Sequence, residues 1–267
     1  MGSTPAGGTK LIKSLSSSGL GHQPFTLGTR VRISLGTPKI KISIRMISII
    51  IPTMWRFAPF ADFASQLVKL DIVGELIIIN NDNSRTPDHP ILLHPKVKVF
   101  DFGRNIFVNP AWNIGAEVAK HDILCFLNDD LIFDLRLLYK VKDFITPQIG
   151  AIGNNTGLVV EGQTPLTTGE IEFERFHGQG CYGFGELMFT HKQNWQAIPD
   201  GLDVGFGDIF IFERFSLNRI PVYFIVNMLH YHKGSTTVKS ILKDDAVLRH
   251  EREQLIYESI RPSLFKR

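Results

Sequence analysis

Three polar clusters follow apolar runs along the chain, and their side chains suit a nucleotide and a metal ion. Thr53, Asn80-Asn81-Asp82 and Asn128-Asp129-Asp130 each come directly after a run of apolar residues. Amides and carboxylates can hold a base and a ribose, and a carboxylate can hold a hard cation. Each cluster alone is also typical of an ordinary polar turn. Their repetition in this order predicts a ligand site at one edge of a sheet.

Asn128-Asp129-Asp130 is the cluster with the most specific chemistry. A divalent ion held by a carboxylate at a strand end can bind a pyrophosphate leaving group and stabilise the charge that develops on it. The same triplet also suits a turn or a helix N-cap. In the context of the other two clusters, we predict a metal site at this triplet.

His230-Tyr231-His232 is a second candidate for metal binding. In an extended segment, residues two apart point to the same face, so both imidazoles can face one site. Imidazole suits Mn²⁺ or Zn²⁺ better than Mg²⁺. We expect His232 to be the ligand, while His230 packs or contacts substrate. The loop that begins at Lys233 offers backbone N–H groups, hydroxyls and a lysine to phosphates.

The candidate general base is Asp208, which follows a glycine-rich stretch at the expected start of a helix. A carboxylate near an acceptor hydroxyl can remove its proton during transfer. An N-cap role suits Asp208 equally well. Asp203 and Glu186 are weaker candidates for the base. Several aromatic residues can stack on a sugar ring or belong to the core: Phe176, Tyr182, Phe184, Phe189 and Trp195.

The elements that must position these residues alternate between strands and helices. Apolar β-branched runs predict strands, and apolar residues at helical spacing predict helices. We expect strands at 47–51, 75–79, 97–100, 122–127 and 222–226, the last continued by 229–232, and helices at 60–70, 110–120, 135–144, 208–218 and 238–259. Asn109 is the expected N-cap of the second helix. This order predicts an α/β fold with a mostly parallel, Rossmann-like sheet flanked by helices and an irregular second half.

The composition is that of a globular protein. The chain has 267 residues, 43% hydrophobic and 21% charged, and no apolar run approaches the 18 or more residues of a membrane span. Two cysteines, Cys125 and Cys181, make a disulfide framework unlikely and favour a reducing, cytoplasmic setting. Residues 1–45 hold seven of the 29 basic side chains and none of the 26 acidic ones, so the remainder is mildly acidic. The net charge of +3 therefore predicts no nucleic-acid partner.

Residues 1–45 are rich in Gly, Ser, Thr and Lys, and we expect a disordered basic leader there. An organelle-targeting segment and a true translation start at Met46 are the alternatives, together with a functional arm. Residues 46–267 are expected to form one domain.

These motifs resemble the GT-A glycosyltransferases, most nearly the family 2-like group and its viral and bacterial relatives. The resemblance runs from about Ile47 to Thr237 and rests on six segments: Ile49–Thr53, Asn80–Asn83, Asn105–Gly115, the DXD-type Asn128–Asp130, Gly207-Asp208 and His232–Ser235. Two positions depart from the family pattern, because Asn128 and Gly207 replace acids. The resemblance divides the domain into a nucleotide-sugar half (46–134), an acceptor half (135–237) and a C-terminal helical tail (238–267).

The resemblance implies a metal-dependent, inverting transfer of a sugar from a UDP- or GDP-sugar to a glycan or another hydroxyl acceptor, with Mn²⁺ or Mg²⁺ as cofactor. Asp130 and His232 would hold the metal, and Asp208 would be the catalytic base. The residues expected to bind the nucleotide sugar are Pro52, Thr53, Arg56, Asn80, Asp82, Asn113, Asn128, Asp129 and Lys233.

Two other functions remain open at this point. A sugar-phosphate nucleotidyltransferase also needs a nucleotide and a metal, but the loop Pro52 to Arg56 lacks the glycines of its phosphate loop. A non-catalytic glycan- or nucleotide-binding module would account for Asn128 and Gly207. The sequence has no Gly-x-x-x-x-Gly-Lys-Ser/Thr loop, no Gly-x-Gly-x-x-Gly that follows a predicted strand, no Gly-x-Ser-x-Gly elbow and no CxxC metal motif.

Overall fold

The computed structural model describes residues 45–154, 158–159, 170–177, 184–228, 230–233 and 243–264, which belong to the compact unit Ser43–Arg267. Residues 1–44, Tyr182 and most of the loop after Lys233 lie outside the described residues, as does the side chain of Phe184. The predictions for those positions are therefore not addressed by the structure.

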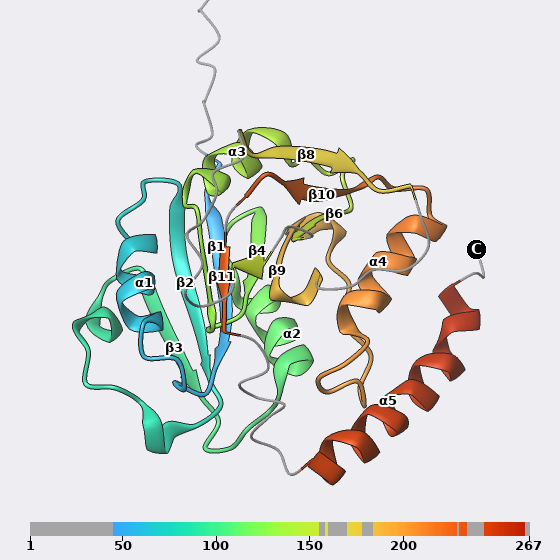
Figure 1. The fold of residues 1–267 in the computed structure, drawn as a ribbon, viewed down its shortest axis with the longest axis horizontal. Helices are drawn as coiled ribbons and strands as arrows, with labels where there is room; N and C mark the ends of the chain where they lie inside the picture. Colours follow the sequence, from blue (N-terminus) through green and yellow to red (C-terminus); the bar gives the residue numbers. More distant parts are fainter. Residues whose placement is uncertain are drawn as a thin grey trace, which may run out of the picture. The chain divides into compact units, whose positions relative to one another are not determined.

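The main sheet has eight strands in the order β3-β2-β1-β4-β9-β6-β10-β8 (Figure 1). Their bounds are Val97–Asp101, Val73–Asn80, Ile47–Thr53, Ile123–Leu127, Leu187–His191, Ala151–Asn154, Val222–Val226 and Glu172–Arg175, in that spatial order. Strands β3, β2, β1 and β4 are mutually parallel, as are β6 and β10. The predicted mostly parallel α/β sheet is confirmed. Strand β9 runs antiparallel to both β4 and β6, and β8 runs antiparallel to β10.

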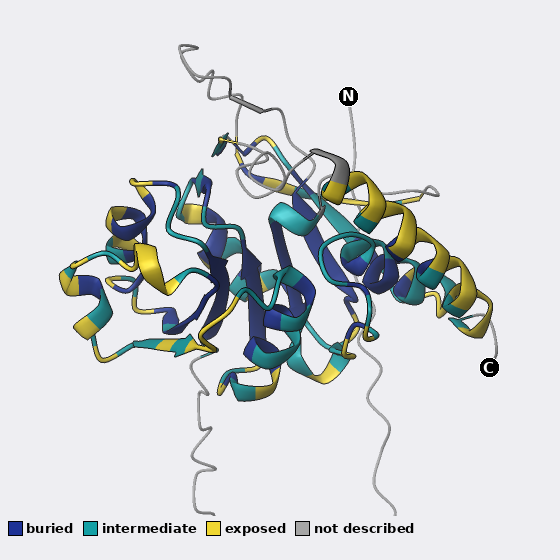
Figure 2. Cartoon of the chain, turned by 90° about the horizontal axis from the view of Figure 1, so that it is seen from below, coloured by how far each residue is buried: buried dark blue, intermediate teal, exposed yellow. Residues whose placement is uncertain are grey.

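In the described part of the chain, five α-helices pack around this sheet: α1 Phe60–Leu67, α2 Val108–Val118, α3 Arg136–Phe144, α4 Gly207–Leu217 and α5 Lys243–Leu264. Successive residues of a strand face opposite sides, so Ile49 and Ile51 join one apolar cluster with α1 and α3, while Ile50 joins another with α2 and α4. Figure 2 shows the central strands buried throughout, whereas the helices are buried along one side. The core is thus a sheet covered on both faces.

A second, three-stranded sheet consists of β5 Leu131–Phe133, β11 His230–His232 and β7 Leu158–Val159, in the order β5-β11-β7. The expectation that 229–232 extends the strand Val222–Val226 is wrong, because β10 belongs to the main sheet and β11 pairs with β5. The chain turns between them at Asn227, whose φ is 60°. The small sheet brings β11 beside the residues that follow β4.

The expected N-cap role of Asn109 is also wrong. Helix α2 begins at Val108, and Phe107 occupies the capping position with φ 67° and no side-chain cap. Asn109 is buried inside the first turn, where its Nδ2 donates to the carbonyls of Leu202 at 3.1 Å and Gly205 at 3.0 Å. A tertiary contact therefore replaces the local cap.

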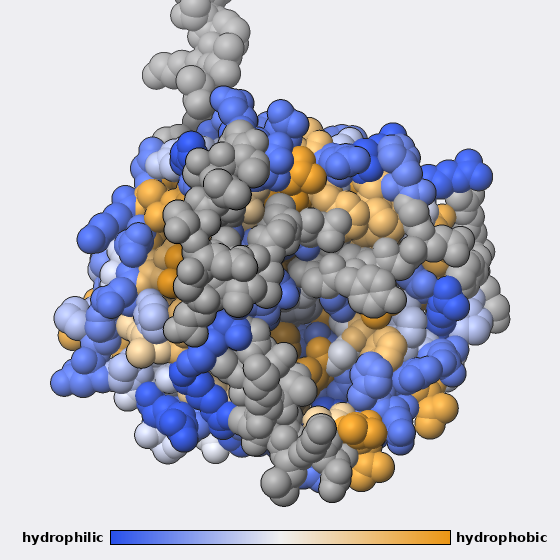
Figure 3. Space-filling model, in the orientation of Figure 1, coloured by the Kyte–Doolittle hydropathy of each residue, from blue (hydrophilic) through white to orange (hydrophobic). Residues whose placement is uncertain are grey.

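None of the described helices is long and apolar enough to cross a membrane. Described side chains around the rim of the face in Figure 3 are mostly hydrophilic.

Candidate functional site

The carboxyl ends of β1, β2 and β4 meet at one edge of the main sheet. Thr53 is in register with Asn80, and β4 pairs alongside β1 up to Phe126. Thr53 Oγ1 donates to Asp129 Oδ2 at 2.5 Å, and the backbone N–H of Met54 donates to the same oxygen at 3.3 Å. Hydrogen bonds therefore join the residues at the carboxyl end of β1 to those that follow β4, as the order of the polar clusters predicts.

Asp129 is the carboxylate at the centre of this edge. Burial raises its pKa, the neighbouring charge of Asp130 adds to this effect, and the hydrogen bonds from Thr53 and Met54 oppose it, so that the pKa is about 6. Asp129 is thus mostly ionised at neutral pH, and it can accept hydrogen bonds from ligand hydroxyls.

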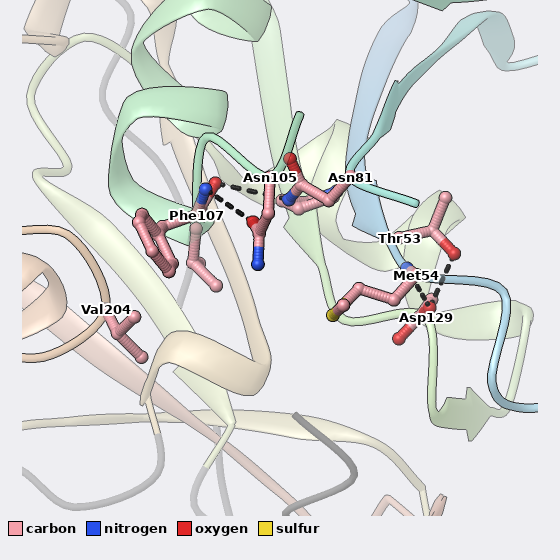
Figure 4. Close-up of a pocket in the computed structure, with 9 residues that line it drawn as sticks. Thr53, Met54, Asn81, Asn105, Phe107, Asp129 and Val204 are labelled. Atoms are coloured by element: carbon pink, nitrogen blue, oxygen red, sulfur yellow. Dashed lines mark hydrogen bonds between the residues drawn. The ribbon is translucent and has the colours of Figure 1, made fainter. Parts of the chain in front are cut away.

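A small, open recess lies at this edge (Figure 4). It is lined by Pro52, Thr53, Met54, Asn81, Asn105, Phe107, Val108, Asp129 and Val204. Asn81 Oδ1 accepts from the N–H of Ile106 at 3.0 Å, which ties the β2 exit to the loop before α2. Figure 4 shows Val204 facing the recess from the side opposite to Asp129. The lining combines apolar side chains with the polar groups of Thr53, Asn105 and Asp129, a mixture that can bind a small molecule.

His232 lies between two carboxylates next to this recess. Its Nε2 is 3.1 Å from Asp130 Oδ1, and its Nδ1 is 3.0 Å from Glu186 Oε1. Burial lowers the pKa of His232, but its hydrogen bonds and charge interactions with Asp130 and Glu186 outweigh this and raise the pKa to about 9. The register of β11 against β5, with His232 opposite Leu131, places the imidazole beside Asp130.

His230 lies on the same side of β11, as the spacing of two predicts. It is 3% exposed, and its Nε2 lies 3.3 Å from Asn154 Nδ2. The same amide nitrogen donates to Glu186 Oε2 at 3.4 Å. Burial lowers the pKa of His230. Glu186 therefore links the two histidines, since it contacts His232 directly and His230 through Asn154.

Asp130 and His232 are suitable protein ligands for a divalent metal ion. Carboxylate oxygen and imidazole nitrogen suit Mn²⁺, and both donors are adjacent here. Within the described residues, no group of three or more His, Cys, Asp or Glu side chains is arranged to hold an ion by itself. An ion at this position would take its remaining ligands from water or from a bound diphosphate.

Asp208 is the second residue of α4, and the capping position belongs to Phe206 instead. Asp208 Oδ2 accepts from the N–H of Gly185 at 3.2 Å, and Oδ1 accepts from the N–H of Ile209 at 2.9 Å. Burial raises the pKa of Asp208, and these backbone hydrogen bonds oppose the rise. A Cβ on Gly185 would lie 3.3 Å from both Asp208 and Trp112, so this glycine allows a close approach.

Several predicted binding residues have other partners in this structure. Asn80 is 2% exposed, accepts from Trp55 Nε1 at 2.9 Å and donates to Thr86 Oγ1 at 2.8 Å. Asp82 pairs with Arg85 at 3.1 Å. Asn113 exchanges two 2.8 Å hydrogen bonds with the backbone of Ile198. None of these three is among the residues that line the recess, so their roles in binding stay predictions.

Three further predicted residues are not among those that line the recess. The backbone N–H of Asn128 donates to the carbonyl of Glu186 at 3.0 Å. Lys233 Nζ lies 5.9 Å from the centre of the Phe57 ring, in the loop that follows β1. In the same loop, Arg56 Nε is buried and has no hydrogen-bond partner among the described residues.

The residues assigned to binding from the sequence did not include several that line the recess, namely Met54, Asn81, Asn105, Phe107, Val108 and Val204. The Asn80-Asn81-Asp82 exit contained the signal for Asn81, because neighbouring residues at a strand end point to different sides. Val204 reaches the recess from far along the chain, and no local pattern marks such a residue. Glu186 was expected only as a weak candidate for the base, whereas it contacts His232.

Solved structures of low sequence identity are similar to this fold. TarS 1–349 of S. aureus in complex with UDP-GlcNAc gives a TM-score of 0.49 and 16% identity, covering 68% of this chain and 58% of that one. GalNAc-T7 with UDP, GalNAc and Mn²⁺ gives 0.48 and 14%, covering 73% of this chain and 46% of that one. A mycobacterial protein gives 0.48 and 13%, covering 73% and 70%. This chain thus spans less than two thirds of the TarS and GalNAc-T7 chains. A comparison with curated proteins found no match.

The sequence also matches a family model, described as glycosyl transferase family 2, over residues 48–220. The matched range runs from β1 to just beyond α4. It contains the residues that line the recess, Asp130 and Asp208, whereas His232 lies after it. It covers well over half of the 267 residues. The chain belongs to glycosyl transferase family 2.

Proposed function

We propose that this protein transfers a sugar from a UDP- or GDP-sugar to a hydroxyl acceptor such as a glycan, with inversion at the anomeric carbon. The observation that carries the proposal is the adjacency of the lined recess and the Asp130–His232 pair at the carboxyl edge of β1, β2 and β4. A nucleoside and the diphosphate attached to it need such neighbouring sites.

The nucleoside occupies the recess in this proposal. Phe107 and Val204 offer apolar surface to a base, Asn105 offers an amide, and the ionised Asp129 accepts hydrogen bonds from ribose hydroxyls. Asn81 shapes the recess, because its amide bonds the backbone of Ile106 and Phe107. The hydrogen bonds from Thr53 and Met54 hold Asp129 in place.

The diphosphate then lies beside Asp130 and His232, which would hold Mn²⁺ or Mg²⁺. When bound, such an ion neutralises the charge that develops on the leaving diphosphate. Glu186 holds the imidazole of His232 through Nδ1 and so leaves Nε2 directed at Asp130.

Asp208 is the general base of the proposed reaction. Its carboxylate would accept the proton of the acceptor hydroxyl while that oxygen forms its bond to the anomeric carbon and the bond to the diphosphate breaks. Burial raises its pKa, which increases its basicity. The free, buried Cys125 is compatible with a reducing compartment, and we place the protein in the cytoplasm.

The test is release of nucleoside diphosphate from a panel of UDP- and GDP-sugars, with and without Mn²⁺. We expect metal-dependent turnover in the wild type and a loss of about 100-fold or more in Asp130→Ala, because an electrostatic stabiliser of the leaving group is lost. Asp143→Ala is the matched control, since Asp143 is an exposed aspartate on α3. The proposal fails if no donor is turned over, or if Asp130→Ala and Asp143→Ala behave alike.

A further inference from the structure

Helix α5 lies outside the residues that match the family, yet two of its side chains are buried. Glu253 is 1% exposed and Tyr257 is 5% exposed, although most of the helix is polar and exposed. Figure 2 shows this long helix, next to the labelled C terminus, exposed along its outer side. A buried carboxylate is costly unless hydrogen bonds satisfy it, so the partners of Glu253 show what α5 holds.

Those partners are backbone N–H groups of the loop that precedes α4. Glu253 Oε2 accepts from Gly205 N at 2.6 Å, and Oε1 accepts from Val204 N at 3.2 Å. Hydrogen bonds to an ionised acceptor are stronger than those between neutral groups. A Cβ at Gly205 would lie 3.1 Å from Glu253 Oε2, so the loop approaches the carboxylate closely.

The neighbouring Asp203 joins α5 to the start of α2. Its carboxylate pairs with Arg249 at 3.1 Å and Arg252 at 2.6 Å. Its carbonyl accepts from the N–H groups of Val108 at 3.1 Å and Asn109 at 3.0 Å, which are the first of α2. One residue therefore links the C-terminal helix to the helix that borders the recess.

Two non-glycine residues with positive φ contact α5: Phe107, which lines the recess, and Phe206, which directly precedes α4. Phe107 has φ 67°, and the Arg249 guanidinium lies 4.0 Å from the centre of its ring. Phe206 has φ 60°, and its ring stacks with those of His250 at 5.1 Å and Tyr257 at 5.3 Å. Such backbone conformations persist only where the surroundings hold them.

We propose that α5 is a clamp that positions one wall of the nucleotide recess and the start of α4, with Glu253 and Arg249 as positioning residues. Val204, held by Glu253, and Phe107, held by Arg249, both line the recess. Asp208 follows Phe206 by two residues, so the clamp also fixes the segment that carries the base. The expected effect on nucleotide affinity rests on the proposed function. The expected effect of α5 on the backbone of these segments does not depend on any ligand.

The experiment compares Glu253→Gln with two controls. Glu251→Gln changes an exposed glutamate on the same helix. Val141→Ala removes buried apolar atoms from α3, on the other face of the sheet, and lowers stability away from the clamp. Amide hydrogen exchange is followed in peptides that cover 105–110 and 202–210, and binding of UDP and of GDP with Mn²⁺ is measured by calorimetry.

In Glu253→Gln we expect faster exchange in both peptides and a nucleotide Kd about tenfold higher, which corresponds to the loss of one charge-assisted hydrogen bond. Arg249→Gln should act in the same direction and serves as the second variant if Glu253→Gln does not fold. Neither effect should appear in Glu251→Gln, and Val141→Ala should leave the Kd unchanged.

Unchanged exchange in both clamp variants overturns the inference. Faster exchange with an unaltered Kd overturns the positioning role, as does an equal loss of affinity in Val141→Ala. If the wild type binds neither UDP nor GDP, the proposed function fails, and exchange alone decides whether α5 is a clamp.

Discussion

Asp208 combines burial with a fixed orientation, the two properties that a general base needs. The N–H groups of Gly185 and Ile209 hold one oxygen each. Burial raises its pKa above the ordinary value of 3.8. At the scale of single residues, this makes Asp208 the group whose removal should affect chemistry more than binding.

We therefore predict that Asp208→Asn lowers kcat by about 10²- to 10⁴-fold, the usual contribution of a general base, and leaves the Kd of the nucleotide within about threefold. The amide oxygen can still accept one of the two backbone hydrogen bonds, so the fold should persist. Asp200→Asn, at an exposed aspartate, is the control. Steady-state kinetics and calorimetry give both values, and an equal loss in kcat and affinity would argue against a base.

The pH profile gives a second check on the same residue. A base works in its ionised form, so activity should fall as the pH drops through the pKa of Asp208, and this pKa is raised. The acid limb of kcat/KM should therefore have its midpoint above pH 3.8 and should be lost in Asp208→Asn. An acid limb that survives in the variant belongs to another group.

Glu186 is a residue whose effect should appear in metal affinity. It hydrogen-bonds Nδ1 of His232 and leaves Nε2 near Asp130. Outer partners of ligating histidines typically contribute 10- to 100-fold to metal affinity, so Glu186→Gln should weaken Mn²⁺ binding by about that factor in the presence of nucleotide. Electron paramagnetic resonance of free Mn²⁺ measures it. Glu174→Gln, at an exposed glutamate of β8, should leave the Mn²⁺ affinity unchanged, and an unchanged affinity in Glu186→Gln would refute the role.

At the scale of elements, one buried carboxylate joins four segments on the amino side of the sheet. Glu75 on β2 is 3% exposed and accepts from Ser48 Oγ on β1 at 2.7 Å and from Lys120 N after α2 at 2.6 Å. Lys98 on β3 forms an ion pair with it. This network holds the strands whose opposite ends carry the site.

Glu75→Gln should lower the free energy of unfolding by about 1–3 kcal/mol, because charge-assisted hydrogen bonds become neutral ones and Lys98 loses its partner. Glu117→Gln, at an exposed glutamate of α2, should change it little. Denaturant unfolding measures both.

The same network sets a pH dependence of stability. Burial acts to raise the pKa of Glu75, but its hydrogen bonds and Lys98 outweigh this and lower it below 4.5. Its contribution is therefore present above pH 4.5 and is lost as the pH falls through the lower pKa of the folded state. The difference between wild type and Glu75→Gln should shrink below pH 4.5, and a difference that grows there would contradict the assignment.

For the whole molecule, the sequence predicted those features of the fold that depend on residues close together in the chain. Apolar runs such as Ile47 to Ile51 identify central strands, and their polar exits meet because parallel strands end at one edge. The proximity of His232 to Asp130 could also be predicted from the sequence, since both residues were expected to bind the same ion. Short strands such as β6 and β9 lack a clear pattern and were missed.

Contacts between distant segments account for the other errors. The sequence around Asn109 is typical of a helix N-cap, but its side-chain amide donates to the carbonyls of Leu202 and Gly205 instead. Val204 lines the recess, and its N–H donates to Glu253, 49 residues later. The burial that gives Glu253 its effect depends on packing between elements, which composition and spacing do not encode.

The most direct measurement is calorimetric titration of the wild type with UDP, GDP and their sugar conjugates in the presence and absence of Mn²⁺. The proposed site predicts saturable, Mn²⁺-dependent binding of at least one of them, weakened about tenfold or more in Asp130→Ala, which corresponds to at least 1.4 kcal/mol. Binding of none of these nucleotides, or binding that Mn²⁺ and Asp130→Ala leave unchanged, would contradict it.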